Sequence, residues 1–176
     1  MELLRLPVLD RPDLVADPVS AALSGWPAAA QVSVAEIDPD LADTAAFNAA
    51  YARPADAGAN CVVVSGRRDG EERVAACVVR SDLRADVNRL VKRLLDVRKA
   101  SFLPMERATE ESGMEYGGIT PVGLPKQWRL LVDASVLAQP DIVIGSGLRR
   151  SKLLLPGRLL AEVPGAEVIE QLGLPV

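Results

Sequence analysis

Apolar residues along the chain either alternate with polar ones or gather in short runs. Two valine-rich runs, NCVVVS at residues 60–65 and ERVAACVVR at residues 72–80, flank the segment GRRDG. Within that segment, Asp69-Gly70 is a strong signal for a tight hairpin turn, because both residue types tolerate positive φ. We therefore predict that the two runs pair as antiparallel strands.

Shorter apolar or alternating runs predict further strands, and amphipathic stretches predict helices. The predicted strands are AAQVSVAEI at residues 29–37, ASFLP at 100–104, RLLVDASVL at 129–137, DIVIGS at 141–146 and KLLLP at 152–156. The predicted helices cover Leu41–Ala52, capped by Asp38 or Asp40, and residues 83–95, 104–112 and 157–163. This interleaving, with one hairpin, predicts a mixed α/β fold: a mixed, largely antiparallel β-sheet flanked by short helices, rather than a doubly wound parallel fold.

The predicted helix at residues 83–95, LRADVNRLVKRLL, has an apolar face and a basic face, and Ser81 or Asp82 can cap it. The basic face holds Arg84, Arg89, Lys92 and Arg93. Such a run of charges is usually a solvated surface, and we favour that interpretation over a phosphate-binding role.

The chain has 176 residues and a mass of 18.7 kDa, which suits a single domain. Only 3% of the residues are aromatic, so the core should be aliphatic. No apolar run is long enough to span a bilayer, and the acidic start MELLRLPVLDRPD is unlike a secretory leader. We therefore expect a cytoplasmic protein, in which residues 1–40 form an N-terminal extension of open role.

Histidine is absent from the chain. This absence excludes Ser-His-Asp and Cys-His catalysis, HExxH zinc helices and a histidine general base. Cys61 and Cys77 lie in valine-rich runs, where we expect buried thiols, and two cysteines alone cannot complete a structural zinc site. We expect neither a metal nor a cofactor. The formal charge of −4 and the pI near 5.0 mean that any nucleic-acid contact must be local.

The segment MEYGGITPVGLP at residues 114–125 fits neither a helix nor a strand. Gly117 and Gly118 permit backbone angles that are closed to other residues, and Pro121 stiffens the segment. Such a loop can present N–H donors to the oxygen of a carboxyl ester, as an oxyanion hole does. The alternative is an ordinary wide turn between a helix and a strand, and the sequence leaves both open.

A second glycine segment, IVIGSGLRRSK at residues 142–152, also follows a predicted strand. It lacks the spacing of a P-loop, and Arg150 stands where a dinucleotide-binding fingerprint needs its third glycine. Taken alone, it is a tight turn that re-enters a sheet. Asp133, at the end of the strand LLVD, is better explained as a helix cap than as a site residue.

The order of these segments resembles the YbaK-like family of aminoacyl-tRNA deacylases, which are relatives of the editing insertion of bacterial prolyl-tRNA synthetases. The segments that carry the resemblance are GANCVVVSG, the hairpin, ADVNRLVKRLLDVRKA, SGMEYGGITPVGLP, LLVDASVL, IVIGSGLRRSKLLLP and LAEVPGAEV. They extend from about residue 41 to residue 172, and GGITP is the most specific. The resemblance implies a mixed α/β domain that hydrolyses the ester between a wrongly attached small amino acid and the 3′ ribose of a tRNA. The partner would be the acceptor end of that tRNA, with no role for DNA or a membrane.

The resemblance also implies roles for individual residues. In this family the glycine loop cradles the aminoacyl group through backbone amides, and the neighbouring ribose hydroxyl of the substrate helps to activate water, a mechanism that needs no histidine. Gly117, Gly118, Asn60 and Asp133 would be the catalytic positions, with Asp133 close to the glycine loops. The substrate-binding positions would be Ile119, Thr120, Pro121, Gly145, Ser146, Gly147 and Lys152, with residues 145–147 on the opposite wall of the pocket.

The chain departs from the family pattern in GANCVVV. Active members usually have a lysine just before this strand, where it helps to hold the terminal nucleotide, and this chain has Asn60. Asparagine can donate a hydrogen bond but supplies no charge, so Asn60 is a weaker catalytic candidate than a lysine. Lys126, Arg129, Arg149 or Lys152 could substitute from another element.

Two hypotheses follow from the sequence. The first is a freestanding deacylase that removes a small amino acid from mischarged tRNA. The second is a binding module that kept the pocket and lost the chemistry, which Asn60 and the acidic pI favour. The sequence leaves open the amino acid, the tRNA and the oligomeric state.

Overall fold

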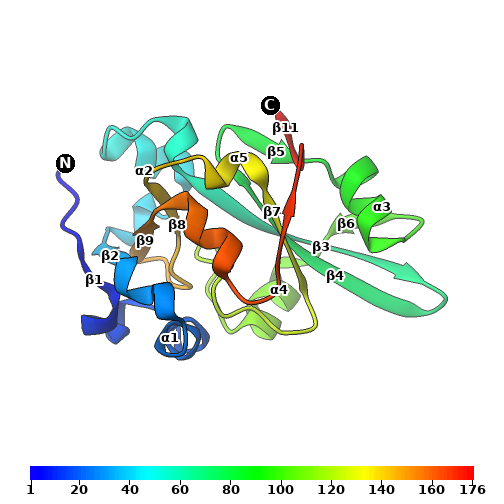
Figure 1. Cartoon of the computed structure of the whole chain (residues 1–176), viewed down its shortest axis with the longest axis horizontal. Helices are drawn as coiled ribbons and strands as arrows, with labels where there is room; N and C mark the ends of the chain where they lie inside the picture. Colours follow the sequence, from blue (N-terminus) through cyan, green and yellow to red (C-terminus); the bar gives the residue numbers. More distant parts are fainter.

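The strands form three sheets in the computed structural model, which describes all 176 residues (Figure 1). The largest sheet has the order β10-β7-β4-β3-β6. Its strands are β3 (Ala59–Arg68), β4 (Glu71–Arg80), β6 (Ala100–Phe102), β7 (Arg129–Asp133) and β10 (Ala166–Ile169). Strand β7 runs parallel to β4 and β10, whereas β3 is antiparallel to β4 and β6.

The second sheet has four strands in the order β1-β2-β9-β8, all antiparallel. These strands are β1 (Leu6–Pro7), β2 (Ser33–Glu36), β8 (Ile142–Gly145) and β9 (Ser151–Leu155). A third pair joins β5 (Leu83–Ala85) to β11 (Gly173–Pro175). The predicted mixed α/β class with mostly antiparallel pairing is confirmed, but the strands divide among three sheets.

The predicted hairpin is confirmed. Strands β3 and β4 pair over their whole length, from Ala59↔Arg80 to Arg68↔Glu71. The turn residues Asp69 and Gly70 have φ values of 52° and 80°, as a primed hairpin turn requires. Figure 1 shows the tip of this hairpin extending to one side of the molecule.

The helices are short. They comprise α1 (Asp17–Ser24), α2 (Thr44–Ala50), α3 (Lys92–Leu95), α4 (Met105–Ser112) and α5 (Ala134–Leu137), the π-helical turn η6 (Val87–Val91), and the 3-10 turns η1 (Val8–Asp10), η2 (Pro12–Leu14), η3 (Pro27–Gln31), η4 (Pro39–Leu41), η5 (Ala55–Ala57) and η7 (Gly157–Glu162). None of these helices is long and apolar enough to cross a membrane.

Two helix predictions need correction. The helix predicted at residues 83–95 begins only at Val87, because Leu83–Ala85 pair with β11 as a strand. The predicted helix at Leu41–Ala52 is α2, which is capped by Asp43. The Asp43 carboxylate accepts hydrogen bonds from the N–H groups of the first turn, whereas Asp38 caps the preceding turn η4.

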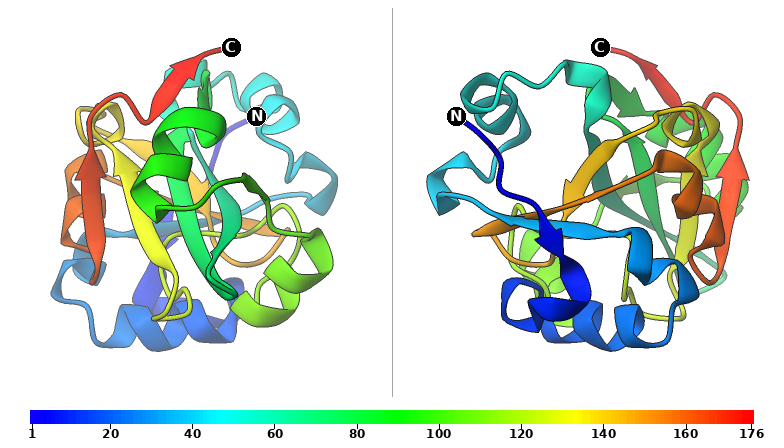
Figure 2. Two further views of the ribbon diagram at one scale, coloured as in Figure 1. Left: turned by 90° about the vertical axis from the view of Figure 1, so that its right-hand side faces the viewer. Right: turned by 60° about the vertical axis from the view of Figure 1, so that its left-hand side comes forward.

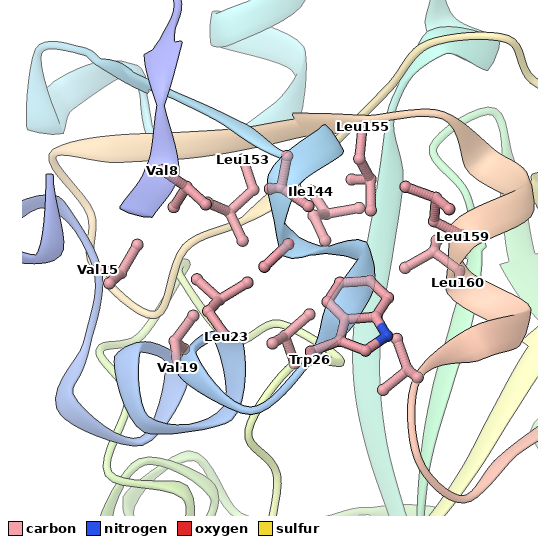
Figure 3. Packing of buried hydrophobic residues seen from close by; sticks show 14 of the residues in the cluster. Val8, Val15, Val19, Leu23, Trp26, Ile144, Leu153, Leu155, Leu159 and Leu160 are labelled. Carbon is pink, nitrogen blue, oxygen red and sulfur yellow. The ribbon is translucent and has the colours of Figure 1, made fainter. Parts of the chain in front are cut away.

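The first forty residues are built into the main core. Val19 and Leu23 of α1 pack beneath Ile144 of β8 and Leu153 of β9, as Figure 3 shows. All four side chains are at most 2% exposed. The two views in Figure 2 place α1 at the base of the molecule, far from the C-terminal strand β11. The core is aliphatic, as the composition predicts.

Candidate functional site

A cavity of about 410 Å³ lies where four parts of the chain meet. Its walls come from α2, the first residues of β3, the glycine segment around Gly117 and the facing ends of β8 and β9. Apolar side chains such as Phe47 and Val143 share the lining with a few polar groups. The cavity therefore has the mixed character of a small-molecule site.

Lys152 brings a positive charge to this cavity. It pairs with Gly145 across the β8–β9 ladder and is only 7% exposed. The Nζ atom donates to the backbone oxygen of Ala42 at 2.8 Å and lies 5.9 Å from the centre of the Phe47 ring. Because an ammonium group has three donors, two remain for a ligand.

Burial lowers the pKa of Lys152 to about 8. The nearby carboxylate of Asp43 acts in the opposite direction, and the guanidinium of Arg149 adds to the lowering. The lysine is therefore mostly charged at pH 7 and loses its charge within the mildly alkaline range.

Asn60 lies on the same cavity, at the start of β3. Its side-chain oxygen accepts a hydrogen bond of 2.7 Å from the hydroxyl of Thr44, in the first turn of α2. This bond fixes the orientation of the amide, and the amide nitrogen has no partner within the protein. Asn60 can therefore donate to a ligand.

The two glycine segments are hydrogen-bonded to each other. The N–H of Glu115 donates to Gly147 at 2.8 Å, and the N–H of Gly147 donates to Gly118 at 2.7 Å. A Cβ atom on Gly145 would lie 2.5 Å from the Gly118 oxygen, and one on Gly118 would lie 2.8 Å from the Leu148 oxygen. These glycines are required because the two backbones approach too closely for any side chain.

This contact corrects the prediction that the glycine segments form opposite walls. They lie side by side in one wall, where only Gly145 of the predicted residues 145–147 borders the cavity. Ser146 is fully buried, with its hydroxyl 2.7 Å from that of Ser151. The N–H of Gly118 is also unavailable, because it donates to Glu115 at 2.9 Å.

Three backbone donors remain in this wall. The N–H groups of Tyr116, Gly117 and Ile119 have no hydrogen-bond partner within the protein, and all three residues border the cavity. Gly117 has a φ of +80°, which favours glycine. The unpaired backbone donors beside the cavity therefore belong to Tyr116, Gly117 and Ile119, and not to Gly118.

The N-terminal residues support this wall from behind. The N–H of Ala16 donates to Ser146 at 3.1 Å, and the hydroxyl of Ser151 donates to Leu14 at 2.5 Å. Gly147 packs against Ala16 so closely that a Cβ on the glycine would lie 2.4 Å from the alanine side chain. Residues 1–40 thus help to hold the second glycine segment in place.

Three predicted site residues lie elsewhere. Thr120 is fully buried away from the cavity, and Pro121 borders a separate groove beside α1. Asp133 caps α5 by accepting from the N–H of Ser135 at 2.8 Å, and it also accepts from the N–H of Gly173. Its catalytic assignment is corrected, because this carboxylate joins β7 to β11 and does not reach the cavity.

Of the four cations that could replace the missing lysine, only Lys152 borders the cavity. Arg149 binds the backbone oxygens of Tyr116 and Pro39, each at 3.1 Å, and so holds the glycine segment against η4. Arg129 pairs with Glu167 on the neighbouring strand, and Lys126 lies in the groove beside α1.

Sequence reasoning missed the contribution of α2. Thr44 and Phe47 of this helix line the cavity, as does Tyr116 beside the first glycine. No local pattern in the sequence indicates that α2 and β3 meet here. Cys61 also borders the cavity, and although it is partly exposed there, its apolar surroundings raise the pKa of its thiol. It therefore stays protonated and is a poor nucleophile.

The fold and the cavity define a small α/β domain whose site combines one buried lysine, one amide and free backbone donors. No group of three or more His, Cys, Asp or Glu side chains could hold a metal ion. The sequence profile of the aminoacyl-tRNA editing domain matches residues 38–163. The chain belongs to this family.

Solved structures share the fold. The chain is similar to a protein described as a proposed trans-editing enzyme for prolyl tRNA synthetase, with a TM-score of 0.72, 20% identity, and 87% of this chain and 93% of that chain covered. It is also similar to the hypothetical protein APE2540, with a TM-score of 0.69, 23% identity, and 80% of this chain and 90% of that chain covered. A scaffold protein used for epitope grafting has a TM-score of 0.74 and 19% identity, with 88% of this chain and 95% of that chain covered. No curated protein matches the sequence.

Proposed function

We propose that the protein is a freestanding aminoacyl-tRNA deacylase, which removes a small, wrongly attached amino acid from the 3′ end of a tRNA. The observation that carries the proposal is the buried Lys152 beside free backbone donors in a cavity without a histidine. Membership of the editing-domain family supports the same reaction class.

In the proposed mechanism, the N–H groups of Gly117 and Ile119 hold the ester carbonyl oxygen. As water attacks the carbonyl carbon, negative charge develops on this oxygen and strengthens both hydrogen bonds. The neighbouring ribose hydroxyl of the substrate orients the water, so the protein needs no general base of its own. The bond between the carbonyl carbon and the ribose oxygen then breaks, that oxygen takes up the proton that the attacking water gives up, and the amino acid and the tRNA leave.

Lys152 and Asn60 position the substrate. The ammonium group supplies positive charge to the phosphate or the ribose oxygens of the terminal nucleotide, the role that family members give to a lysine near the position of Asn60. Asn60 adds a neutral donor, held by Thr44 at 2.7 Å. The volume of about 410 Å³ must hold both the sugar and the aminoacyl group, which favours a small amino acid.

The alternative function is a binding module without turnover. Asn60 favours it, because the amide supplies no charge, and so does the formal charge of −4. Such a module would bind an aminoacyl-nucleotide, a small ligand or a protein partner through the same cavity.

The test is a deacylation assay over a panel of mischarged tRNAs, with a parallel titration of an unreactive aminoacyl-adenosine that carries an amide in place of the ester. A deacylase hydrolyses at least one substrate, and Gly117→Val abolishes that turnover because a β-branched residue is strained at a φ of +80° and its Cβ would displace Arg149. Tight binding of the analogue without turnover of any tRNA would establish the binding module instead.

A further inference from the structure

A second groove continues from the cavity along β3. It has a volume of about 820 Å³, and it shares Asn60 and Val62 with the cavity. Strand β6 pairs with β3 only at Val64–Gly66, and the N–H of Leu103 donates to the Val63 oxygen at 2.8 Å, so β6 does not cover the edge at residues 59–62. A ligand chain that enters the cavity can therefore leave it along this edge.

The groove has an exposed aromatic ring on one side. Phe102, the last residue of β6, is 64% exposed, and only four phenylalanine and tyrosine residues occur in the whole chain. An aromatic side chain left in water beside a groove is a natural stacking surface for a nucleobase. The other aromatic residues do not line the groove, and these are Trp26, Phe47, Tyr51, Tyr116 and Trp128.

Two arginines also line the groove. Arg84 of β5 is exposed and forms no ion pair, whereas Arg89 of η6 is held by the buried carboxylate of Asp86 at 3.2 Å. Because that pair is neutral, Arg84 gives the groove a net positive charge. The predicted basic helix face does not exist as one surface: Arg84 and Arg89 turn to this groove, and Lys92 and Arg93 do not border it.

We propose that this groove is a subsite for the nucleotide that precedes the terminal adenosine of the tRNA. This proposal rests on the proposed function, because it assumes that the cavity holds the aminoacyl end. The base of that nucleotide stacks on Phe102. Its phosphate lies near Arg84, and the RNA chain passes Asn60 on its way into the cavity. Such a local cationic groove reconciles nucleic-acid binding with an acidic protein.

The experiment compares two substrates that carry the same amino acid. One is a mischarged tRNA minihelix, and the other is an aminoacyl-adenosine, which has no preceding nucleotide. Phe102→Ala should lower kcat/KM on the minihelix about tenfold and leave the aminoacyl-adenosine unchanged. Arg84→Gln should lower kcat/KM on the minihelix about fivefold. It should also reduce the slope of log kcat/KM against log salt concentration by the amount expected for about one phosphate contact.

Matched controls lie outside the groove. Val168→Ala removes an exposed apolar side chain from β10, and Arg98→Gln removes an exposed arginine, so both should leave both substrates unchanged. Equal losses on the two substrates would overturn the subsite, because the groove variants would then act through the cavity or the fold. No loss on either substrate would also overturn it, as expected if the groove binds a protein partner.

A wild-type protein that hydrolyses neither substrate would refute the proposed function and not the subsite. The subsite is then tested by binding of an unreactive aminoacyl-CCA trinucleotide and of the matching aminoacyl-adenosine. Tighter binding of the trinucleotide that disappears in Phe102→Ala supports the subsite. Equal affinities for the two ligands, or an affinity that Phe102→Ala leaves intact, overturn it.

Discussion

The two sides of the cavity are built in different ways. One wall is backbone: the two glycine segments contact each other so closely that no Cβ fits between them. The other side is made of side chains. The Thr44 hydroxyl orients Asn60, and the backbone oxygen of Ala42 holds the ammonium group of Lys152. The backbone wall therefore fixes the geometry of the site, whereas the side-chain wall sets its charge and can change without a change of fold.

The largest effect should come from a single methyl group in the backbone wall. In Gly145→Ala the new Cβ would lie 2.5 Å from the Gly118 oxygen and 2.8 Å from the Ile119 oxygen, so the segments must separate. We expect a loss of about 1–3 kcal/mol in the free energy of unfolding. Deacylation should fall at least about a hundredfold, because the free N–H groups move with the wall.

The matched control for this change is Gly25→Ala. Gly25 has no atom within 4 Å of its added Cβ and no positive φ, so the variant should resemble the wild type in both assays. Denaturant unfolding and kcat/KM on one mischarged tRNA measure the two effects. Full activity in Gly145→Ala would show that the close contact is not needed for the site.

The second effect concerns the charge on the side-chain wall. Lys152→Met keeps most of the side-chain volume and removes the ammonium group, so deacylation at pH 7 should fall about a hundredfold. Because the pKa of Lys152 is lowered to about 8, the ratio of wild-type to variant activity should decrease as the pH rises from 7 to 9. A ratio that does not change with pH would mean that the charge of Lys152 does not act on the substrate.

The same lysine should also affect stability in a defined pH window. Its folded-state pKa lies below the unfolded value of 10.5, so the unfolded chain binds more protons between pH 8 and 10.5. Stability of the wild type relative to Lys152→Met should therefore rise with pH in this window, by at most about 1.4 kcal/mol per pH unit. Urea unfolding of both proteins at pH 7, 8, 9 and 10 measures this difference, and the ionisation of the two cysteines cancels in it.

A smaller effect should come from the neutral donor. Asn60→Ala removes one hydrogen bond to the substrate and should lower kcat/KM about fivefold. Thr44→Val should cost less, because it only frees the orientation of Asn60. The double variant should be no worse than Asn60→Ala, since the two residues act as one unit. Additive losses would show that Thr44 contacts the substrate independently.

Local patterns were sufficient for much of the fold. Asp69-Gly70 predicted the hairpin, and Gly113 ends α4 in the left-handed conformation with a φ of 68°. They failed at Leu83–Ala85, which have helical spacing but pair with the distant strand β11. The division into three sheets also depends on pairings across the chain, such as that of β2 with β9, which no local window contains.

The site was predicted less completely for the same reason. The two glycine segments were identified from their sequences, yet their mutual contact joins residues about thirty positions apart. The Gly118 donor is lost to Glu115 in a local turn, which the glycine pattern does not predict. The cavity position of Lys152 follows from its pairing with Gly145, and the role of Thr44 follows from the meeting of α2 and β3. Neither is visible in the local sequence around those residues.

The smallest effect on activity should come from Asp133, the carboxylate that lies outside both walls. Asp133→Asn keeps the size of the side chain but cannot accept hydrogen bonds from both Ser135 and Gly173, because one carboxylate oxygen becomes an amide donor. We expect a loss of about 1–2 kcal/mol in the free energy of unfolding and an unchanged kcat/KM. Denaturant unfolding and the deacylation assay, both at a temperature where the variant stays folded, separate the two. A large fall in kcat/KM with unchanged stability would return Asp133 to the catalytic machinery, and the cavity could then not be the whole of the active site.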